Sequence, residues 1–245
     1  MVFLQAALNG TRTRDAHDGV PVTPEQLAHD AKAAVEAGVR AVHVHPRGDG
    51  GAESLHPDHV DAAVAALREA VPDVELSLTT GLWITGGDVA QRLEQVRGWS
   101  ELPDCCSLNV AEDGWRELGE LLAERGVWLE AGLSAAAHPE QLADAGLAGR
   151  CRRALVEPQE TAPAIAVATA GAIDGGLERE GVELPQLHHG TDLTTWAVLD
   201  AATRREREIR VGLEDTLWLP DARRAASNAE LVAAAVERYG FSSSG

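Results

Sequence analysis

Residues 23–45 read TPEQLAHDAKAAVEAGVRAVHVH, and this stretch indicates the fold. Thr23 is followed by a proline and, three positions on, by Gln26, which is typical of a helix start. Gly38 is typical of a helix end. The residues between them follow the helical period, whereas Ala41–His45 is a short apolar run typical of a buried strand. The stretch therefore predicts a helix followed by a strand, the repeating unit of a parallel α/β protein.

The same alternation of strand and helix continues along the whole chain. Short apolar or β-branched runs, each followed by a helical pattern, predict a parallel sheet covered by helices. The predicted strands are Val2–Leu8, Ala41–His45, Glu75–Thr79, Cys105–Asn109, Val127–Ala131, Ala154–Glu157, Gln186–His189 and Ile209–Leu213. The predicted helices are Pro24–Ala37, His59–Ala70, Asp88–Gly98, Gly114–Arg125, Pro139–Ala145, Thr161–Leu177, Thr195–Glu206 and Ala226–Tyr239.

Eight such units in 245 residues match the (β/α)8 TIM barrel, an α/β fold whose usual length is about 250 residues. A doubly wound sheet is the alternative, and it normally has a glycine-rich phosphate-binding turn after its first strand. Residues 9–12 read NGTR, which is not such a turn. We therefore predict a single TIM-barrel catalytic domain over residues 1–240. Residues 241–245 are predicted to form a flexible tail.

The composition narrows the classes of partner. The formal net charge is −18, which argues against a nucleic-acid partner, because nucleic-acid affinity depends on Lys and Arg neutralising phosphates. No apolar run approaches the roughly 18 residues of a membrane span, and no basic segment precedes the apolar N-terminus. We therefore expect neither membrane insertion nor secretion. Three cysteines without a metal-binding spacing fit a reducing cytoplasm, and the single lysine, Lys32, lies within a predicted helix, which argues against Schiff-base chemistry.

Polar side chains gather where the predicted strands end, and this face of a TIM barrel carries the active site. His43-Val44-His45 is the sharpest of these features. Residues i and i+2 of a strand point to the same face, so the two imidazoles lie side by side at the barrel mouth. Glu214, at the eighth strand, would complete a His2Glu set typical of catalytic zinc. The alternative is that both histidines cap the strand and bond to the backbone.

Other strand ends carry further candidates. Asn109 is a candidate substrate-binding residue. Glu130 and Glu157 are candidates to bind a substrate amine or another polar group, and pairing with arginines is the alternative for both. Of His188 and His189, one faces the barrel interior because successive strand residues alternate, and we expect it to be His189.

These motifs together resemble those of the β-keto acid cleavage enzymes, whose best-known activity is 3-keto-5-aminohexanoate cleavage. The resemblance covers nearly the whole chain. The motifs that carry it are Ala7-Leu8-Asn9-Gly10-Thr11, Thr23-Pro24-Glu25, His43-Val44-His45-Pro46-Arg47, Thr79-Thr80-Gly81, Ser107-Leu108-Asn109, Arg210-Val211-Gly212-Leu213-Glu214-Asp215 and Ser227-Asn228-Ala229-Glu230-Leu231-Val232.

The resemblance implies a zinc-dependent TIM barrel that condenses a β-keto acid with acetyl-CoA. The products would be acetoacetate and the CoA thioester of the remaining acyl group. His43, His45 and Glu214 would hold the metal. Arg210 and Asp215 would form the charge pair responsible for proton transfer.

The resemblance also concerns substrate binding and assembly. The turn formed by Thr79, Thr80 and Gly81 would meet the carboxylate of the keto acid. A homo-oligomer, commonly a tetramer, would be expected.

Two positions depart from the family pattern and concern the substrate pocket. Where many members carry a glutamate shortly after the first strand, this chain has Arg12. Where a small hydroxyl residue is usual after the fourth strand, it has Ala111 and Glu112. We expect Arg12 and Glu112 to contact the substrate or each other, and a surface Arg–Glu pair without influence on selectivity is the alternative.

Other functions for the same barrel remain as alternatives. A metal-dependent hydrolase of the amidohydrolase type also carries an HxH pair, but at its first strand, with further histidines where this chain has Glu130 and Glu157. A class II aldolase needs a phosphate site near strands seven and eight, and those strand ends are acidic here. A catalytically silent barrel would leave His43, His45 and Glu214 without a metal, so metal analysis separates it from the enzymes.

Overall fold

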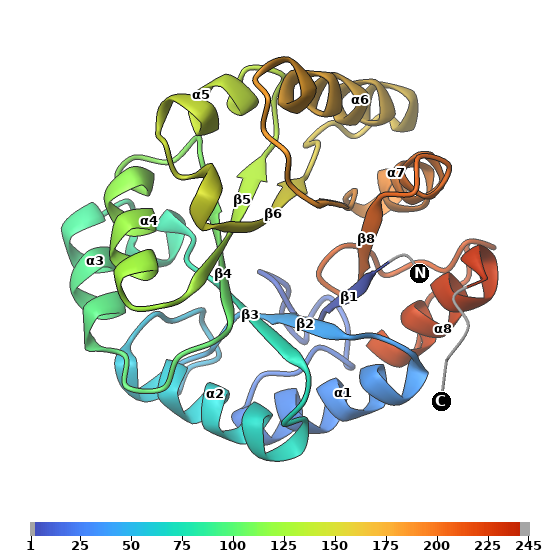
Figure 1. Ribbon diagram of the computed structural model, residues 1–245. Helices are drawn as coiled ribbons and strands as arrows, with labels where there is room; N and C mark the ends of the chain where they lie inside the picture. Colours follow the sequence, from blue (N-terminus) through green and yellow to red (C-terminus); the bar gives the residue numbers. More distant parts are fainter. Residues whose placement is uncertain (1–2, 241–245) are drawn as a thin grey trace.

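The structure is a computed structural model, and it describes residues 3–240. Eight parallel strands form a closed barrel in chain order, and the helices surround it (Figure 1). The predicted (β/α)8 fold is confirmed. The strands are β1 Leu4–Ala7, β2 Ala41–Val44, β3 Glu75–Thr79, β4 Cys105–Asn109, β5 Trp128–Leu133, β6 Cys151–Val156, β7 Gln186–His188 and β8 Glu208–Val211. The helices are α1 Pro24–Ala37, α2 Pro57–Ala70, α3 Val89–Gly98, α4 Trp115–Glu124, α5 His138–Asp144, α6 Pro163–Arg179, α7 Thr195–Thr203 and α8 Asn228–Tyr239.

The predicted elements all exist, but several of their ends differ. β8 ends before the predicted Leu213 because the chain turns there: the carbonyl of Gly212 accepts the backbone N–H of Asp215 at 2.9 Å. α2 begins earlier than predicted because the ring of His56 accepts the backbone N–H of Asp58 at 3.3 Å and so caps the helix. The first predicted residue of β1, Val2, and the predicted tail at 241–245 lie outside the described residues.

The closure of the barrel between β1 and β8 positions one functional side chain. At Gly212 a side-chain carbon would collide with the backbone carbonyl of Ala7, so the end of β8 lies this close to β1 because residue 212 is a glycine. The backbone N–H of Glu214 donates to Ala7 O at 3.2 Å. Gly10 has a φ of 56°, and a side-chain carbon there would collide with the side chain of Glu214. Two glycines thus leave room for Glu214 beside the first two strands.

An ionic cluster fills the barrel interior below the mouth. Arg153 of β6 donates from Nη1 to Glu75 Oε1 at 2.7 Å and to Glu130 Oε1 at 2.6 Å. Its Nε lies 3.3 Å from Glu208 Oε2, and its guanidinium stacks 4.3 Å from the ring centre of Phe3. Glu75 and Glu208 are the first residues of their strands, so the cluster lies toward the end of the barrel opposite the mouth. We call Glu75, Glu130, Arg153 and Glu208 the lower layer.

The lengths of the helices and the state of the cysteines bear on where the chain could function. Within residues 3–240, no helix is both long and apolar enough to span a bilayer. Cys105, Cys106 and Cys151 are buried and unpaired. Burial raises the pKa of the Cys151 thiol to about 12 and raises the pKa of the other two thiols as well, so all three are poor nucleophiles in the folded chain.

Candidate active site

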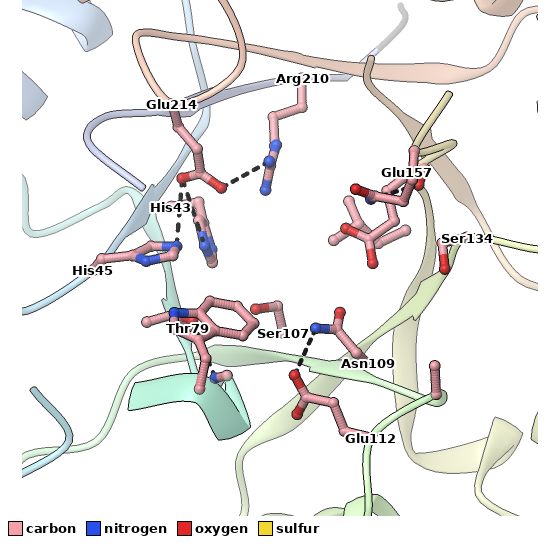
Figure 2. A pocket seen from close by; sticks show the side chains of 15 residues that line it. His43, His45, Thr79, Ser107, Asn109, Glu112, Ser134, Glu157, Arg210 and Glu214 are labelled. Atoms are coloured by element: carbon pink, nitrogen blue, oxygen red, sulfur yellow. Dashed lines mark hydrogen bonds and ion pairs between the residues drawn. The ribbon is translucent and has the colours of Figure 1, made fainter. Parts of the chain in front are cut away.

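A cavity of about 290 Å³ opens at the carboxyl ends of the strands. Residues of β2, β3, β4, β6 and β8, and of the loops after these strands and after β5, line it (Figure 2). On one side lie His43, His45 and Glu214, and across the cavity from them lie Ser134 and Glu157. The cavity therefore has the position expected for the active site of a TIM barrel.

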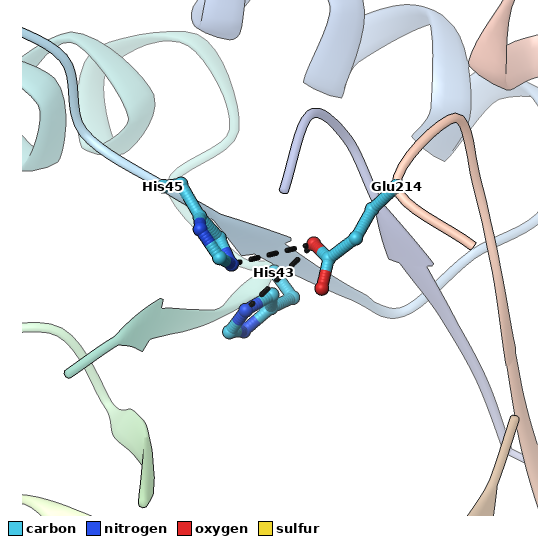
Figure 3. A group of neighbouring side chains, drawn as sticks. All are labelled: His43, His45 and Glu214. Carbon is cyan, nitrogen blue, oxygen red and sulfur yellow. Dashed lines mark ion pairs between the residues drawn. The ribbon is translucent and has the colours of Figure 1, made fainter. Parts of the chain in front are cut away.

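His43, His45 and Glu214 come together as the sequence predicts (Figure 3). Their ligand atoms all lie within 4.8 Å of one another. Glu214 Oε2 lies 3.5 Å from His45 Nε2 and 3.9 Å from His43 Nε2, and this buried oxygen has no hydrogen-bond partner within residues 3–240. An unpaired carboxylate oxygen facing two imidazole nitrogens is an arrangement that a divalent cation would satisfy.

The second nitrogen of each imidazole already has a partner. His43 Nδ1 lies 2.9 Å from Ser77 Oγ, and Ser77 donates its hydroxyl proton to Glu130. The serine oxygen must therefore accept from His43, which places the proton on Nδ1 and leaves Nε2 as an electron-pair donor. His45 Nδ1 lies 2.5 Å from Glu53 Oε1, which has the same effect. Such outer partners orient metal-binding histidines and fix their tautomers.

The electrostatics of the cluster favour a charged Glu214 carboxylate and shift the pKa values of the two imidazoles in opposite directions. Burial opposes the ionisation of Glu214, but Arg210 and the two histidines outweigh it and hold the pKa of that carboxyl well below its usual range. Burial, helped by Arg210 and His45, lowers the pKa of His43 to about 4, so its ring is neutral. Burial also opposes charge on His45, but Glu214 and Glu53 raise the pKa of His45 above its ordinary value.

Arg210 connects Glu214 to a second carboxylate. Its Nη2 donates to Glu214 Oε1 at 2.9 Å and to Asp215 Oδ1 at 2.7 Å. His189 Nδ1 lies 3.1 Å from the same Asp215 oxygen. Burial would lower the pKa of Arg210, but the two carboxylates raise it. Asp215 itself is 2% exposed. It does not line the cavity, but it bonds to Arg210, which does.

His189, rather than His188, faces the mouth as expected. Its Nε2 lies 3.5 Å from Glu157 Oε2 at the cavity wall. His188 points outside the barrel, where its Nε2 lies 3.2 Å from Asp174 Oδ1 of α6.

The predicted substrate-binding residues occupy four different places. Thr79, Gly81, Asn109 and Glu112 line the cavity. Thr80 lies behind this wall, where its hydroxyl donates to the carbonyl of Ser107 at 2.5 Å.

Glu130 and Arg12 lie outside the cavity lining. Glu130 is fully buried in the lower layer, where it accepts from Arg153 and Gln5, so the structure agrees with the alternative of arginine pairing. Arg12 lies at the rim, where its Nη2 donates to Asp192 Oδ1 at 2.6 Å and its Nε to the backbone carbonyl of Glu214 at 3.2 Å.

Arg12 and Glu112 each bond to other residues and not to each other within the described residues, so contact with the substrate is the expectation that stays open for them. Glu112 accepts instead from Arg92 Nη1 at 2.6 Å, from Asn109 Nδ2 at 2.9 Å and from the backbone N–H of Leu82 at 3.0 Å. Arg92 of α3 is fully buried. No motif in the sequence indicates that this helix residue is the partner of Glu112.

Two residues that support the histidines, Ser77 and Glu53, were not predicted from the sequence. Ser77 precedes Thr79 by two positions on β3, and this alternation could have placed it on the interior face. Glu53 belongs to the loop after β2, where an antiparallel bridge joins it to Arg47. Residues 48–51 between them read GDGG, a turn signal that could have indicated this reversal of the chain.

Comparisons with known proteins identify relatives of this chain. The family model of the beta-keto acid cleavage enzymes matches residues 1–173 and 187–240. A 3-keto-5-aminohexanoate cleavage enzyme of Fusobacterium nucleatum is 29% identical over 137 residues, which cover 51% of this chain and 50% of that protein. A 3-dehydrocarnitine:acetyl-CoA trimethylamine transferase of Rhizobium meliloti is 38% identical over 92 residues, 36% of this chain and 29% of that protein. The matched segments thus span half the length of these curated relatives or less.

A solved structure shows the same fold. It is described as a binary complex of ObcA with oxaloacetate, and it superposes with a TM-score of 0.72 at 17% identity, covering 90% of this chain and 63% of that one. At this identity the likeness concerns the barrel alone. The family match, by contrast, extends over most of the sequence. The chain belongs to the β-keto acid cleavage enzyme family.

Proposed function

We propose that this chain condenses a β-keto acid with acetyl-CoA and releases acetoacetate and a new acyl-CoA. Membership of the family supports this reaction. The observation that carries it is the convergence of His43, His45 and Glu214 within 4.8 Å in a cavity that Arg210 also lines.

We also propose that the three ligands hold a divalent metal and that the metal is zinc. Two imidazoles and one carboxylate suit zinc and leave positions open for substrate. The unpaired Oε2 of Glu214 and the two Nε2 atoms that face it fit such an ion. When bound, the ion would supply Lewis acidity to the ketone and carboxylate oxygens of the keto acid.

The substrate carboxylate is assigned to the wall formed by the end of β3. Thr79 and Gly81 line the cavity beside the two histidines. Thr80 does not face the cavity, but its bond to Ser107 fixes the turn against β4. In this arrangement the Thr79 hydroxyl would donate to the carboxylate, and Arg210 would balance its charge from the opposite side.

The proton removed from the substrate is assigned to the pair of Arg210 and Asp215. Asp215 Oδ2 is buried and has no hydrogen-bond partner within the described residues, whereas Oδ1 is held by Arg210 and His189. Oδ2 is therefore the free basic atom of the pair. Since Arg210 separates Asp215 from the cavity and also bonds to Glu214, proton uptake at Asp215 would require the guanidinium to shift toward Glu214.

We further propose that the chain works as a homo-oligomer, a tetramer, in the cytoplasm. The family resemblance supports the assembly, and the three buried, unpaired cysteines are compatible with a reducing compartment. Sedimentation of the purified protein would test the tetramer, because a monomer at micromolar concentration would contradict it.

A product analysis tests the reaction. Metal-replete protein is incubated with a panel of β-keto acids and isotopically labelled acetyl-CoA, and thioesters are identified by mass spectrometry. We expect labelled acetoacetate together with a new acyl-CoA, and no turnover without acetyl-CoA. Free acid plus acetate, formed at the same rate without any CoA, would contradict the proposal and support the hydrolase instead.

A further inference from the structure

β1 supplies none of the three metal-ligand candidates, yet it lies between the two strands that do. It pairs with β2 on one side and with β8 on the other. His45 comes one residue after the end of β2, and Glu214 comes three residues after the end of β8. Figure 3 shows their side chains pointing toward each other. The separation of these two side chains therefore depends on how β1 holds the strand ends on either side of it.

The regular backbone bonding of the barrel stops before it reaches these two ligands. β1, β2 and β8 end at residues 7, 44 and 211. Beyond these ends, His45 and Leu213 are still buried, and buried backbone groups require hydrogen-bond partners. Two asparagine side chains supply these partners.

Asn9, which is fully buried, holds the backbone of His45. Its Oδ1 accepts the backbone N–H of His45 at 2.9 Å and that of Gly10 at 3.0 Å. Its Nδ2 donates to the carbonyl of His45 at 2.9 Å and to that of Pro21 at 3.2 Å. An amide has two donors and two acceptor sites, so Asn9 uses its full capacity and bonds to both backbone groups of His45.

Asn228, fully buried at the start of α8, holds the residue before Glu214. Its Oδ1 accepts the backbone N–H of Leu213 at 2.6 Å, and its Nδ2 donates to the carbonyl of Leu8 at 2.8 Å. Nδ2 also donates to Asp30 Oδ2 at 2.5 Å. One side chain of α8 thus joins the ends of β1 and β8.

We propose that Asn9 and Asn228 are positioning residues that fix the separation of His45 and Glu214 before a metal binds. The inference rests on the proposed function for the metal itself. Two zinc ligands at tetrahedral positions about 2.1 Å from the ion lie about 3.4 Å apart, and Glu214 Oε2 already lies 3.5 Å from His45 Nε2. Such a fit requires ligands held to within about 0.5 Å, which strand ends without these bonds would not provide.

Zinc affinity and cobalt spectroscopy test the positioning role. Asn9→Ser and Asn228→Ser each remove an amide that joins two strand ends, and competition with a chelator measures the zinc affinity. We expect each variant to bind zinc about 10-fold more weakly, because the residues that support metal ligands typically have effects of this size. The visible absorption spectrum of the cobalt(II)-loaded protein, which reports the arrangement of the ligands, should change in both variants.

The matched control is Asp104→Ser, which breaks a side-chain bridge at the opposite end of the barrel. Asp104 immediately precedes β4, and its Oδ2 accepts the backbone N–H of Leu76 of β3 at 2.8 Å. This variant should lose stability in chemical denaturation but keep the zinc affinity and the cobalt spectrum of the wild type. The control separates a change in ligand arrangement from a general loss of stability.

Hydrogen exchange in the wild-type protein tests the same role without a substitution, so it does not depend on the folding of the variants. We expect the backbone amides of His45 and Leu213 to exchange slowly in metal-free protein and to remain unchanged when zinc is added. Slow exchange that appears only with zinc would mean that the metal, and not the asparagines, orders these strand ends. That result would overturn the inference.

Two results of the affinity measurements would also overturn it. One is wild-type zinc affinity in both serine variants, and the other is an equal loss of affinity in Asp104→Ser. Wild-type protein that binds no zinc would contradict the proposed metal site and the positioning role with it. The failure of the metal site is therefore seen in the wild type, and a failure of the positioning role alone is seen in the variants.

Discussion

Two clusters of charged residues lie inside the same barrel, and they differ in how their charges are balanced. In the lower layer, Arg153 bonds to Glu75 and Glu130 and also pairs with Glu208. At the mouth, Glu214 keeps one buried oxygen unpaired and faces a cavity. The contrast shows that burial of charge alone does not indicate chemistry. Glu208 Oε2 in the lower layer also lacks a hydrogen bond, but it lies 3.3 Å from its cation, Arg153 Nε. Glu214 Oε2 instead faces two imidazole nitrogens at an open cavity, and this arrangement indicates chemistry.

The largest expected effect is on stability, when the lower layer loses its cation. Arg153→Met leaves the fully buried Glu130 and the partly buried Glu75 and Glu208 without their common partner. Removing one member of a buried ion pair costs about 3–5 kcal/mol of unfolding free energy. Chemical denaturation measures it. The matched control is Arg152→Met, because Arg152 pairs with the same Glu75 carboxylate at 3.1 Å but its side chain is half exposed. It should therefore contribute less than about 1 kcal/mol. Equal stability of both variants would show that the lower layer is not structural.

The mouth should respond in metal content rather than in stability. We expect wild-type protein, purified without chelator, to hold about one divalent ion per chain, and His43→Ala to lose most of it because one of three ligands is gone. Elemental analysis measures this, with His29→Ala as the control, since His29 is an exposed residue of α1. Wild-type protein without stoichiometric metal would show that the ligand assignment is wrong.

Ser77 links the two clusters, so changing it tests whether the lower layer influences the mouth. It bonds to His43 and to Glu130, so Ser77→Ala should weaken metal binding about 10- to 100-fold, as loss of an outer partner typically does. Competition with a chelator measures the affinity. Ser107→Ala, on the neighbouring strand, should leave it unchanged. An unchanged affinity in Ser77→Ala would mean that the lower layer does not orient His43.

The smallest effect is expected at the rim. Arg12 pairs with a half-exposed Asp192, so Arg12→Ala should change the unfolding free energy by less than about 1 kcal/mol and leave metal content intact. If Arg12 acts on the substrate, the variant should alter the ranking of kcat/KM among neutral, anionic and cationic β-keto acids. An unaltered ranking would show that Arg12 has no influence on substrate selectivity.

The sequence predicted those features that depend on local pattern. The helix from Pro24 to Ala37 was predicted with its observed bounds, because its cap, proline and final glycine are all local signals. The pair His43 and His45 could be predicted because strand residues alternate. Glu214 needed one more assumption, namely barrel closure, which brings β8 next to β1.

The remaining site residues depend on contacts between distant elements. Glu130 ends in the lower layer rather than at the mouth, because its position along β5 is set by pairing with β4 and β6. Glu112 pairs with Arg92 of α3, and Glu53 reaches His45 through an irregular loop. No periodicity in the sequence reports a helix packed against a loop or a loop that folds back over a strand.

The two glycines beside Glu214 have a consequence for mutational screening. Gly10 and Gly212 carry no reactive group, yet a methyl group at either position would displace the Glu214 carboxylate or the strand that holds it. In a library selected for activity, both positions should therefore tolerate no substitution, alanine included, and would be indistinguishable from the metal ligands. A parallel selection for folded protein alone would separate Gly10, which contacts the Glu214 side chain, from Gly212, which closes the barrel.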